Sequence, residues 1–300
     1  MATNPKIKHL VYVPFTGVGL IGYRGDEWFH ERIQIFLNYT LKSLLAQTNR
    51  NFTLWLSFRP EEKENPQVEN VAIILKGLGM PYFMTFDGLM YHDDKFGGTL
   101  FSKIANTGRI IRRCWRLNLW SEFWPSFKDI FNDKNKTLVE RIDRSLEEMP
   151  KEWREAEWVY MSRIDSDDMF HKNYIQYMQE YAVVAHISPE KKWAMTPTDG
   201  LIYNTTTCEV AEWKPPTNPP FHTIIFPSDV FFDANRYTTH YGDFRSHEDV
   251  RRVFTCAELR GPVYCVTTHN PKNHISTIWN HPFRGRVLEN PQEILKNFGL

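Results

Sequence analysis

The chain has 300 residues with 36 basic and 36 acidic side chains, and its formal net charge of zero gives no electrostatic reason to expect a nucleic-acid partner. Apolar residues make up 42% of the chain and charged residues 24%, as in soluble globular proteins, and no apolar run approaches the length of a membrane span. Aromatic residues reach 15%, which suits a large core or a surface that stacks on sugars.

Neither the N-terminus nor the cysteines point to secretion. Residues 1–8 are polar and lack the apolar stretch of a signal peptide. The four cysteines show no CxxC spacing, which favours thiols in a reducing compartment. We therefore expect a cytoplasmic protein.

Strands and helices alternate through the first part of the chain. Short apolar runs predict strands at residues 10–14, 51–58 and 82–86. Apolar residues spaced by three and four predict the intervening helices at about 32–47 and 66–79. Strand, helix, strand, helix, strand is the pattern of a parallel sheet with right-handed crossovers.

A fourth strand leads into an acidic cluster. Two further helices, expected at 102–123 and 134–149, precede a strand at 158–162. That strand continues into the sequence Arg-Ile-Asp-Ser-Asp-Asp at 163–168. In doubly wound sheets, ligands bind in the crevice outside the carboxyl ends of the strands, so this cluster is a candidate ligand site.

The second half of the chain has a different pattern. We expect strands at 193–196, 200–204 and 263–267, an extended aromatic stretch at 222–232 and a helix at 246–259. The whole chain, 1–300, is expected to form one α/β domain. Its first half, about 7–170, would bind one ligand, and its second half, about 171–300, another.

Asp165 and Asp167 are the most informative residues. They are two positions apart, so both carboxylates can point the same way if the extended geometry continues. Paired carboxylates at a strand end suit a hard divalent cation that also carries a diphosphate. Without a cation they would repel, and one pKa would rise. The alternative is a structural turn in which Asp168 caps the next helix.

Five segments, taken in order, carry a resemblance to a known family: Thr40–Thr48, Phe52–Trp55, Arg163–Asp168, Pro219–Phe221 and His269–Asn270. Together they resemble inverting, family-2-like glycosyltransferases of the GT-A fold, and they are most similar to the rhamnosyltransferase-like family. The resemblance covers about residues 9–280. It implies a GT-A (Rossmann-like) fold, a doubly wound mixed sheet in a single domain.

The resemblance assigns roles to the acidic cluster. Asp167 would be a direct ligand of Mn²⁺ or Mg²⁺, and Asp165 would contact the metal site or the ribose of a nucleotide-sugar donor. A late histidine often completes this metal site, which implies His269, with His274 as the alternative. Lys272 would pair with the donor diphosphate.

The resemblance also implies a general base at the start of a late helix. Asp249 is the first candidate and Glu248 the second, because a base must take the proton of the acceptor hydroxyl. Ser246 and Asp249 also have the spacing of a capping box. Both roles are compatible, since a helix start holds a carboxylate rigidly.

Further donor contacts are expected at four positions. Asp87, which follows the third strand, resembles a nucleobase contact. Thr16 and Arg163 would contact the nucleobase and a phosphate. Arg109 belongs to a group of arginines at 109, 112, 113 and 116 that share one helical face. That face is either solvated, or in contact with a diphosphate, or docked on the inner face of an anionic membrane with the help of neighbouring tryptophans.

The sequence thus predicts a metal-dependent, inverting glycosyltransferase of the hexosyltransferase type. It would move a sugar, rhamnose by family likeness, from a nucleotide-sugar to a hydroxyl of a glycan or glycolipid. One alternative is a sugar nucleotidyltransferase, which the loop at 16–20 disfavours because it lacks a basic residue. Another is a metal-dependent hydrolase that uses Asp165, Asp167, His247 and His269. A non-catalytic glycan-binding module is the third.

Overall fold

The computed structural model describes residues 6–15, 26–87, 100–117, 120–124, 127–128, 138–184, 191–215, 219–241, 247–269 and 279–300. In its first half the strands are β1 (Ile7–Pro14), β2 (Thr53–Ser57), β3 (Tyr82–Thr85) and β4 (Trp158–Arg163). The helices there are α1 (Asp26–Ile35), α2 (Leu41–Leu45), α3 (Pro66–Gly77), α4 (Leu100–Leu117) and α6 (Leu138–Glu147). A π-helical turn, η1 (Phe36–Thr40), joins α1 to α2, and shorter turns are η2 (Pro60–Glu62), η3 (Trp120–Glu122) and η4 (Lys151–Glu155).

The second half adds eight strands and several short helices. The strands are β5 (Met169–Phe170), β6 (Trp193–Pro197), β7 (Gly200–Asn204), β8 (Glu209–Trp213), β9 (His222–Pro227), β10 (Thr255–Leu259), β11 (Tyr264–Thr268) and β12 (Arg284–Val287). The helices are α7 (Tyr174–Val184), α8 (Ser228–Phe231), α9 (Ala234–Tyr241), α10 (Val250–Val253) and α11 (Pro291–Leu295), with the turns η5 (His247–Asp249) and η8 (Lys296–Phe298).

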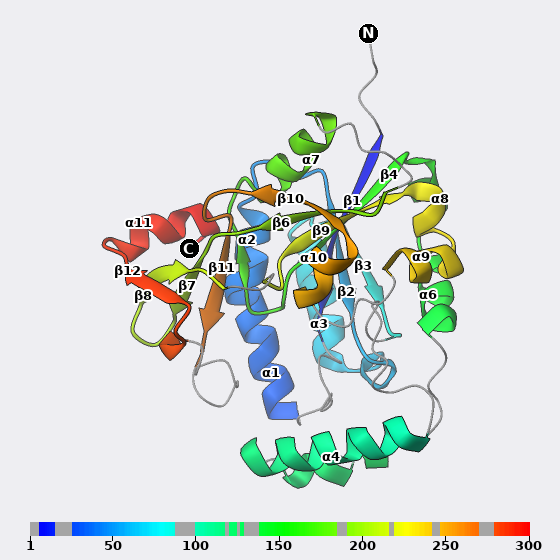
Figure 1. The fold of residues 1–300 in the computed structure, drawn as a ribbon, viewed down its shortest axis with the longest axis horizontal. Helices are drawn as coiled ribbons and strands as arrows, with labels where there is room; N and C mark the ends of the chain where they lie inside the picture. Colours follow the sequence, from blue (N-terminus) through cyan, green and yellow to red (C-terminus); the bar gives the residue numbers. More distant parts are fainter. Residues whose placement is uncertain are drawn as a thin grey trace.

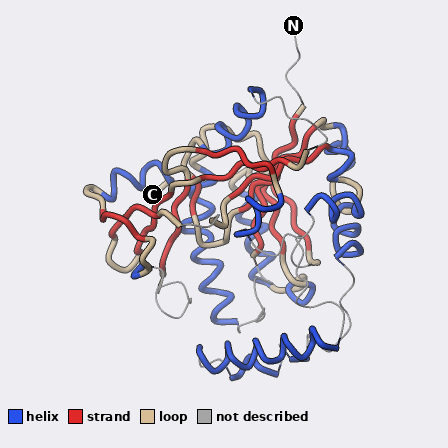
Figure 2. The backbone as a smooth tube through the Cα atoms, viewed as in Figure 1, coloured by secondary structure: helices blue, strands red, loops and turns tan. Residues whose placement is uncertain are grey.

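A seven-stranded sheet forms the centre of the molecule, with strand order β10-β6-β9-β4-β1-β2-β3 (Figures 1 and 2). Strand β9 runs antiparallel to β4 and β6, and every other neighbouring pair in this sheet is parallel. The chain order moves outward from β1 to β3 and then returns to place β4 on the other side of β1. The sheet is therefore doubly wound and mixed, as the sequence predicts, with its switch point between β1 and β4.

Side chains of β1 alternate between the two faces of the sheet, and both faces are covered by apolar clusters. Leu10 and Tyr12 belong to one apolar cluster, Val11 and Val13 to the other, and all four side chains are fully buried. Helices α1, α3 and α7 contribute to the cluster on one face, and α6, α9 and α10 to the cluster on the other. Burial on both faces explains why these strands read as continuous apolar runs.

A smaller sheet with strand order β12-β8-β7-β11-β5 lies beside the first. Its edge strand β5 comes directly after the acidic cluster and pairs antiparallel with β11, with Phe170 opposite Tyr264 and Met169 opposite Cys265. This pairing brings the residues that follow β11 next to the residues that precede β5. It is the reason that the cluster at 163–168 meets the segment at 267–269.

Three predicted elements differ from the structure. The helix expected at 246–259 is a short turn and helix, 247–253, followed by strand β10, because Thr255–Leu259 pairs with β6 at the sheet edge. The extended stretch expected at 222–232 ends at Pro227, where helix α8 begins. Proline has no N–H for a strand ladder, and its fixed φ suits the beginning of a helix. Helix α1 also begins earlier than expected, with Asp26 and Glu27 in its first turn.

Candidate functional site

The candidate site lies at the switch point of the large sheet. Strand β4 ends at Arg163, and a turn follows in which the Asp168 N–H donates to the Asp165 carbonyl oxygen at 3.2 Å. We use the name strand-end cluster for the following side chains: Arg32, Arg163, Asp165, Ser166, Asp167 and Asp168. The position is the one that the sequence predicts for a ligand site in this fold.

Asp167 is held by an arginine that the sequence analysis did not identify. Its carboxylate oxygens accept hydrogen bonds from Nη1 and Nη2 of Arg32, both at 2.8 Å, and Arg32 Nε donates to Ser166 Oγ at 2.7 Å. The Asp167 side chain is 1% exposed and the Arg32 side chain 12%. This is the bidentate fork that guanidinium and carboxylate groups form best.

A signal for Arg32 was present in the sequence. Arg32 follows Phe29 by three positions and precedes Phe36 by four, so it lies on the helical stripe that those buried residues define. An arginine on an apolar stripe needs a buried acceptor. What the spacing could not give is the identity of that acceptor, which lies 135 residues further along the chain.

Asp165 and Asp168 have different surroundings. Asp165 is 26% exposed, and its Oδ1 accepts a hydrogen bond from Arg163 Nη2 at 3.0 Å. Asp168 is 4% exposed, and its Oδ1 accepts from the Thr267 N–H at 3.0 Å. Asp168 therefore bonds to strand β11 and does not serve as a simple helix cap. Of the three carboxylates, Asp165 is the one that solvent reaches.

Burial dominates the acid–base behaviour of the cluster. It raises the pKa of the Asp168 carboxyl well above its usual value, and the charges of Asp167 and Asp165 raise that pKa further. Burial also raises the pKa of Asp167, while the Arg32 guanidinium opposes the rise. The expectation that crowding raises a carboxyl pKa is confirmed in direction, with desolvation as the larger cause.

His269, the predicted metal ligand, lies next to the cluster. It is 7% exposed, and burial together with the charge of Arg32 lowers its pKa to about 4, so its ring is neutral at pH 7. The Thr267 hydroxyl donates its one hydrogen to the Asp167 carbonyl oxygen and lies 2.7 Å from His269 Nε2. Nε2–H is then the donor in that contact, because the hydroxyl hydrogen is already used.

The predicted metal ligands, Asp165, Asp167 and His269, already have other partners in this geometry. Within the ranges given above, no three His, Cys, Asp or Glu side chains are arranged to hold a metal ion. Both oxygens of Asp167 accept from Arg32, and the His269 nitrogen nearest the cluster carries a hydrogen. In this arrangement the donor set fits a guanidinium cation and does not fit a metal ion. A divalent cation on Asp167 would have to displace Arg32.

The predicted general base lies in the turn η5. The Asp249 side chain is 26% exposed. Its Oδ1 forms an ion pair with Arg252 Nε at 3.1 Å. Asp249 makes no side-chain capping bond to α10, and Ser246 and the side chain of Glu248 lie outside the described residues. Because Ser246, the other half of the predicted capping box, is not described, the capping box stays a prediction.

A buried histidine links this turn to the strand-end cluster. His222 pairs in register with Arg163 across β9 and β4. Burial lowers the pKa of His222 well below its usual value, and the charges of Arg163 and His247 lower it further. Both charges thus act on His222, which relates the turn at 247–249 to the Arg163 end of the cluster.

Asp87 and Arg109 are not part of the strand-end cluster. Asp87 lies two residues after β3. Its carboxylate pairs with Arg144 and accepts a hydrogen bond from Ser145 Oγ at 3.1 Å, which holds α6 at this end of the sheet. Strand β3 lies three positions from β4, a separation of about 14 Å. Arg109 is exposed on α4. Thr16, Lys272 and His274 lie outside the described residues.

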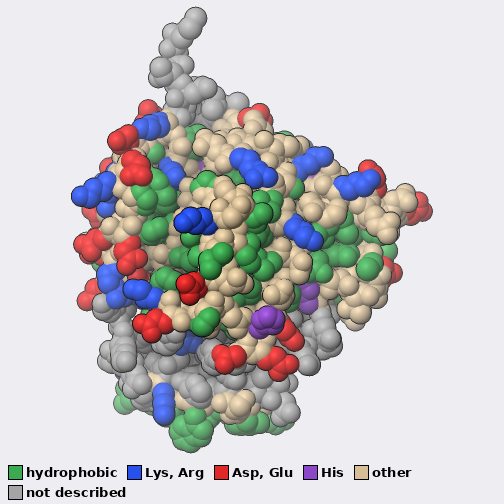
Figure 3. Space-filling model, turned by 180° about the vertical axis from the view of Figure 1, so that it is seen from behind, with side chains coloured by type: hydrophobic (Ala, Val, Ile, Leu, Met, Phe, Trp, Pro, Cys, Tyr) green, Lys and Arg blue, Asp and Glu red, His purple; other side chains and the backbone are tan. Residues whose placement is uncertain are grey.

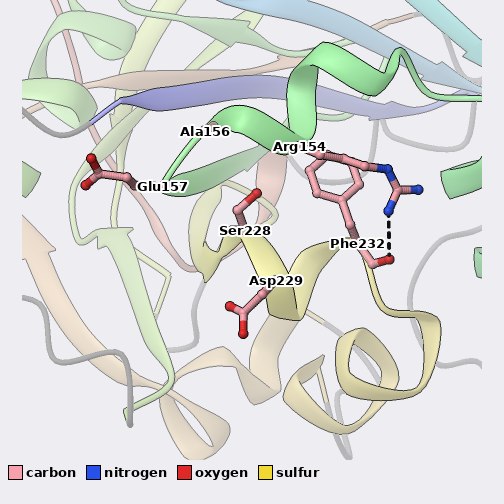
Figure 4. Close-up of a pocket in the computed structure, with 6 residues that line it drawn as sticks. All are labelled: Arg154, Ala156, Glu157, Ser228, Asp229 and Phe232. Carbon is pink, nitrogen blue, oxygen red and sulfur yellow. Dashed lines mark hydrogen bonds between the residues drawn. The ribbon is translucent and has the colours of Figure 1, made fainter.

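A pocket of about 430 Å³ lies elsewhere (Figure 4). It is lined by Arg154, Ala156, Glu157, Ser228, Asp229 and Phe232. Ala156 and Glu157 directly precede β4, so this pocket is at the amino end of the strand whose carboxyl end carries the acidic cluster. The two are separated by the length of β4, about 20 Å.

The sheet topology places the chain among doubly wound α/β proteins, a class in which ligands bind at the carboxyl ends of the strands. Residues 23–67, which include Arg32, match the family described as "Putative rhamnosyl transferase". With the mixed α/β sheet, this match supports a glycosyltransferase with a GT-A-like fold, as the sequence predicts.

One similar solved structure is described as a "putative nucleotide-diphospho-sugar transferase from Desulfovibrio desulfuricans G20". It shares 12% identity with this chain, and the alignment covers 88% of this chain and 80% of that chain with a TM-score of 0.31. No curated protein matches the chain.

Proposed function

We propose that this chain transfers a sugar from a nucleotide-sugar donor to a hydroxyl of a glycan or glycolipid acceptor. The description of the matched family favours rhamnose as the sugar. The observation that carries the proposal is the strand-end cluster, in which two guanidinium groups and a partly exposed carboxylate lie at the switch point of a doubly wound sheet.

The two guanidinium groups of the cluster, each paired with a carboxylate, carry the charge that suits a diphosphate leaving group. As the bond between the anomeric carbon and the diphosphate breaks, negative charge collects on the phosphate oxygens. Arg32 and Arg163 are the cations of the cluster, and prearranged cations stabilise such charge in the transition state. Asp165 is exposed enough to accept hydrogen bonds from a ribose hydroxyl of the donor.

The predicted requirement for Mn²⁺ or Mg²⁺ stays a prediction. When bound, such a cation would supply Lewis-acid stabilisation of the leaving group. Asp165 and Asp167 are the side chains with suitable oxygens, and Arg32 competes for the second of them. Metal dependence therefore becomes a question about whether Arg32 stays on Asp167 when the donor binds.

Asp249 is the proposed general base of an inverting reaction. The acceptor hydroxyl would give its proton to the Asp249 carboxylate while its oxygen forms a bond to the anomeric carbon. The bond to the nucleoside diphosphate breaks in the same displacement, and the diphosphate keeps the electron pair. The partial exposure of Asp249, and the relation of its turn to the Arg163 end of the cluster through His222, support this role.

The test is calorimetry with a panel of nucleoside diphosphates and nucleotide-sugars. We expect at least one to bind, and we expect Asp165→Asn to weaken it about tenfold or more, because a hydrogen bond to a charged group contributes about 1.5–3 kcal/mol. The matched control is Asp229→Asn, whose carboxylate forms an exposed ion pair with Arg236 away from the cluster. Equal losses in both variants would contradict the assignment of the site.

A chelator and the variant Arg32→Gln then separate the two cations. If the chelator abolishes donor binding and Arg32→Gln does not, a divalent cation displaces Arg32. If Arg32→Gln abolishes binding and the chelator has no effect, the guanidinium contacts the donor directly. A chain that binds no nucleotide-sugar, or that joins a nucleoside triphosphate to a sugar phosphate, is not the transferase proposed.

A further inference from the structure

Helix α4 has an unusual distribution of charge. Its sequence contains no aspartate or glutamate. Its basic residues are Lys103, Arg109, Arg112, Arg113 and Arg116. Because the chain as a whole is neutral, this helix is a local concentration of positive charge.

The same helix exposes a row of large apolar side chains. Leu100, Ile104, Ile111 and Trp115 are 68%, 59%, 42% and 76% exposed. Their spacings of four, seven and four place them on one side of the helix, and we call them the exposed stripe. Phe101, which is 82% exposed, borders it. An isolated exposed leucine needs no explanation, but a continuous row of this kind marks an interaction surface.

A different side of α4 faces the protein. Ile110 and Cys114, four residues apart, are both fully buried. They attach the helix to the body of the molecule, so the exposed stripe is not the packing face. Arg112 is exposed next to the stripe, and Arg109 is exposed further round the helix. The helix therefore has three sides: one buried, one apolar and exposed, and one basic and exposed.

The position of α4 makes these sides accessible. The helix crosses the end of the molecule opposite to the N-terminus (Figure 1). In the space-filling view, hydrophobic side chains gather along that same end (Figure 3). Two further tryptophans shortly after α4, Trp120 and Trp124, are 49% and 63% exposed.

We propose that α4 docks in the headgroup region of an anionic lipid bilayer. The exposed stripe would enter the boundary between headgroups and acyl chains, and the arginines would contact lipid phosphates. Tryptophan favours that boundary because its ring is apolar and its N–H is polar. No helix in the described part of the chain is long and apolar enough to span a bilayer, so the contact is peripheral.

Charge favours lipid over a second copy of the chain as the occupant. A two-fold symmetric contact through α4 would place the same surface of both copies together. Both helices would then bring positive charge to the contact region, with no acidic residue on either helix to offset it. An anionic bilayer removes this repulsion and accepts the apolar stripe as well.

The orientation of the protein on the bilayer affects which sugar acceptor the strand-end cluster can reach. Strand β1 begins near the N-terminus and runs away from it, so the carboxyl ends of the parallel strands point toward the end of the molecule that α4 covers (Figure 1). A docked α4 would hold the strand-end cluster on the bilayer side. If the proposed function is correct, a lipid-linked acceptor fits this geometry; the docking itself does not depend on it.

The test measures co-sedimentation with vesicles. We expect the wild-type chain to bind phosphatidylglycerol–phosphatidylcholine vesicles at low salt, and to bind phosphatidylcholine alone weakly. Ile104→Asp should weaken binding about tenfold or more, because it places a charge at the acyl boundary. The control is Ile73→Asp on α3, where the isoleucine is 62% exposed against 59% for Ile104.

A second co-sedimentation test reverses the charge of two arginines on α4. The double variant Arg109→Glu with Arg112→Glu should also weaken binding about tenfold or more, since each basic residue near the surface contributes about 1 kcal/mol. The matched control reverses two exposed lysines elsewhere, Lys63→Glu with Lys76→Glu. Added salt should weaken the wild-type interaction in the same direction.

Three results would overturn the proposal. One is a wild-type chain that ignores anionic vesicles at low salt. The second is an equal effect of the α4 variants and their controls. The third is a dimer in analytical ultracentrifugation that Ile104→Asp dissociates while vesicles are not bound, which would assign the stripe to a second copy. Calorimetry with nucleotide-sugars, run in parallel, shows separately whether the proposed function fails.

Discussion

The strand-end cluster and helix α4 both concentrate charge, and they differ in what balances it. In the cluster, Asp167 and Asp165 each have a guanidinium partner within 3.0 Å. On α4 the charged residues are all basic, and large apolar side chains are exposed beside them. The cluster pairs opposite charges inside the protein, whereas α4 concentrates charge of one sign at the surface.

The physical reason for the difference is burial. A buried charge without a partner costs several kcal/mol, so the fold has to supply the partner itself. Exposed charges are solvated by water, and like charges in water repel only weakly at the separations found on a helix surface. A concentration of charge of one sign can therefore persist on the surface of α4 but not inside the cluster.

The largest expected effect tests whether a paired carboxylate can still act on a substrate. Asp249 is paired with Arg252, as the charges of the cluster are paired, yet it is partly exposed, as the charges of α4 are exposed. Asp249→Asn keeps the shape of the side chain and cannot take a proton. Turnover should fall about 10²–10⁴-fold, the usual range for a lost general base, with donor affinity nearly unchanged. Steady-state kinetics and calorimetry on the same preparation measure both.

Arg252→Gln is the matched control for Asp249→Asn. It removes the ion pair and leaves the carboxylate, so it should keep most of the turnover if Asp249 acts as a base. Equal losses in the two variants would mean that the ion pair only holds the turn in place. NMR of the product adds an independent check, because a single displacement inverts the anomeric centre.

The second prediction compares two ion pairs of similar length. Arg32 and Asp167 lie 2.8 Å apart and are almost buried, whereas Arg236 and Asp229 lie 2.7 Å apart and are more than half exposed. Arg32→Leu leaves a buried carboxylate without its partner and should lower the free energy of unfolding by about 3–5 kcal/mol. Arg236→Leu should lower it by about 1 kcal/mol or less. Urea unfolding measures both.

A double variant keeps this comparison testable if Arg32→Leu folds poorly. Arg32→Leu combined with Asp167→Asn removes the charge along with its partner, so it should recover part of the lost stability. Similar small losses for Arg32→Leu and Arg236→Leu would show that burial does not distinguish the two pairs.

The smallest expected effect concerns a buried group that stays neutral instead of being paired. Burial lowers the pKa of His240 to about 4, against about 6.5 in an unfolded chain. Between these values the unfolded chain binds a proton that the folded chain does not. Stability from this group is complete above about pH 6.5 and is lost as the pH falls toward 4, by about 1.4 kcal/mol per pH unit.

His240→Phe isolates that contribution, because the ring still packs against Phe226 and no longer titrates. Urea unfolding at several pH values should show a shallower loss of stability below pH 6.5 in the variant than in the wild type. Asp168 works in the opposite direction, since its raised pKa lets the folded chain keep a proton that the unfolded chain loses. Parallel pH curves for variant and wild type would contradict the assignment to His240.

The elements that were predicted correctly are those whose signal is local. Strands β1 to β4 are apolar runs because both faces of the large sheet are covered, and the acidic cluster is found from its place after the fourth of them. The helix expected at 246–259 was wrong because pairing with β6 at the sheet edge, a long-range contact, decided the conformation of Thr255–Leu259.

The sequence by itself determined which residues form the central strands and that three carboxylates end β4, because hydrophobic periodicity and spacing are local properties. Only the tertiary structure decided what those carboxylates contact. Arg32 reaches Asp167 across 135 positions, and Thr267 reaches Asp168 across 99. Such pairings depend on how a helix packs over a sheet and how two strands register, and a one-dimensional spacing does not contain that information.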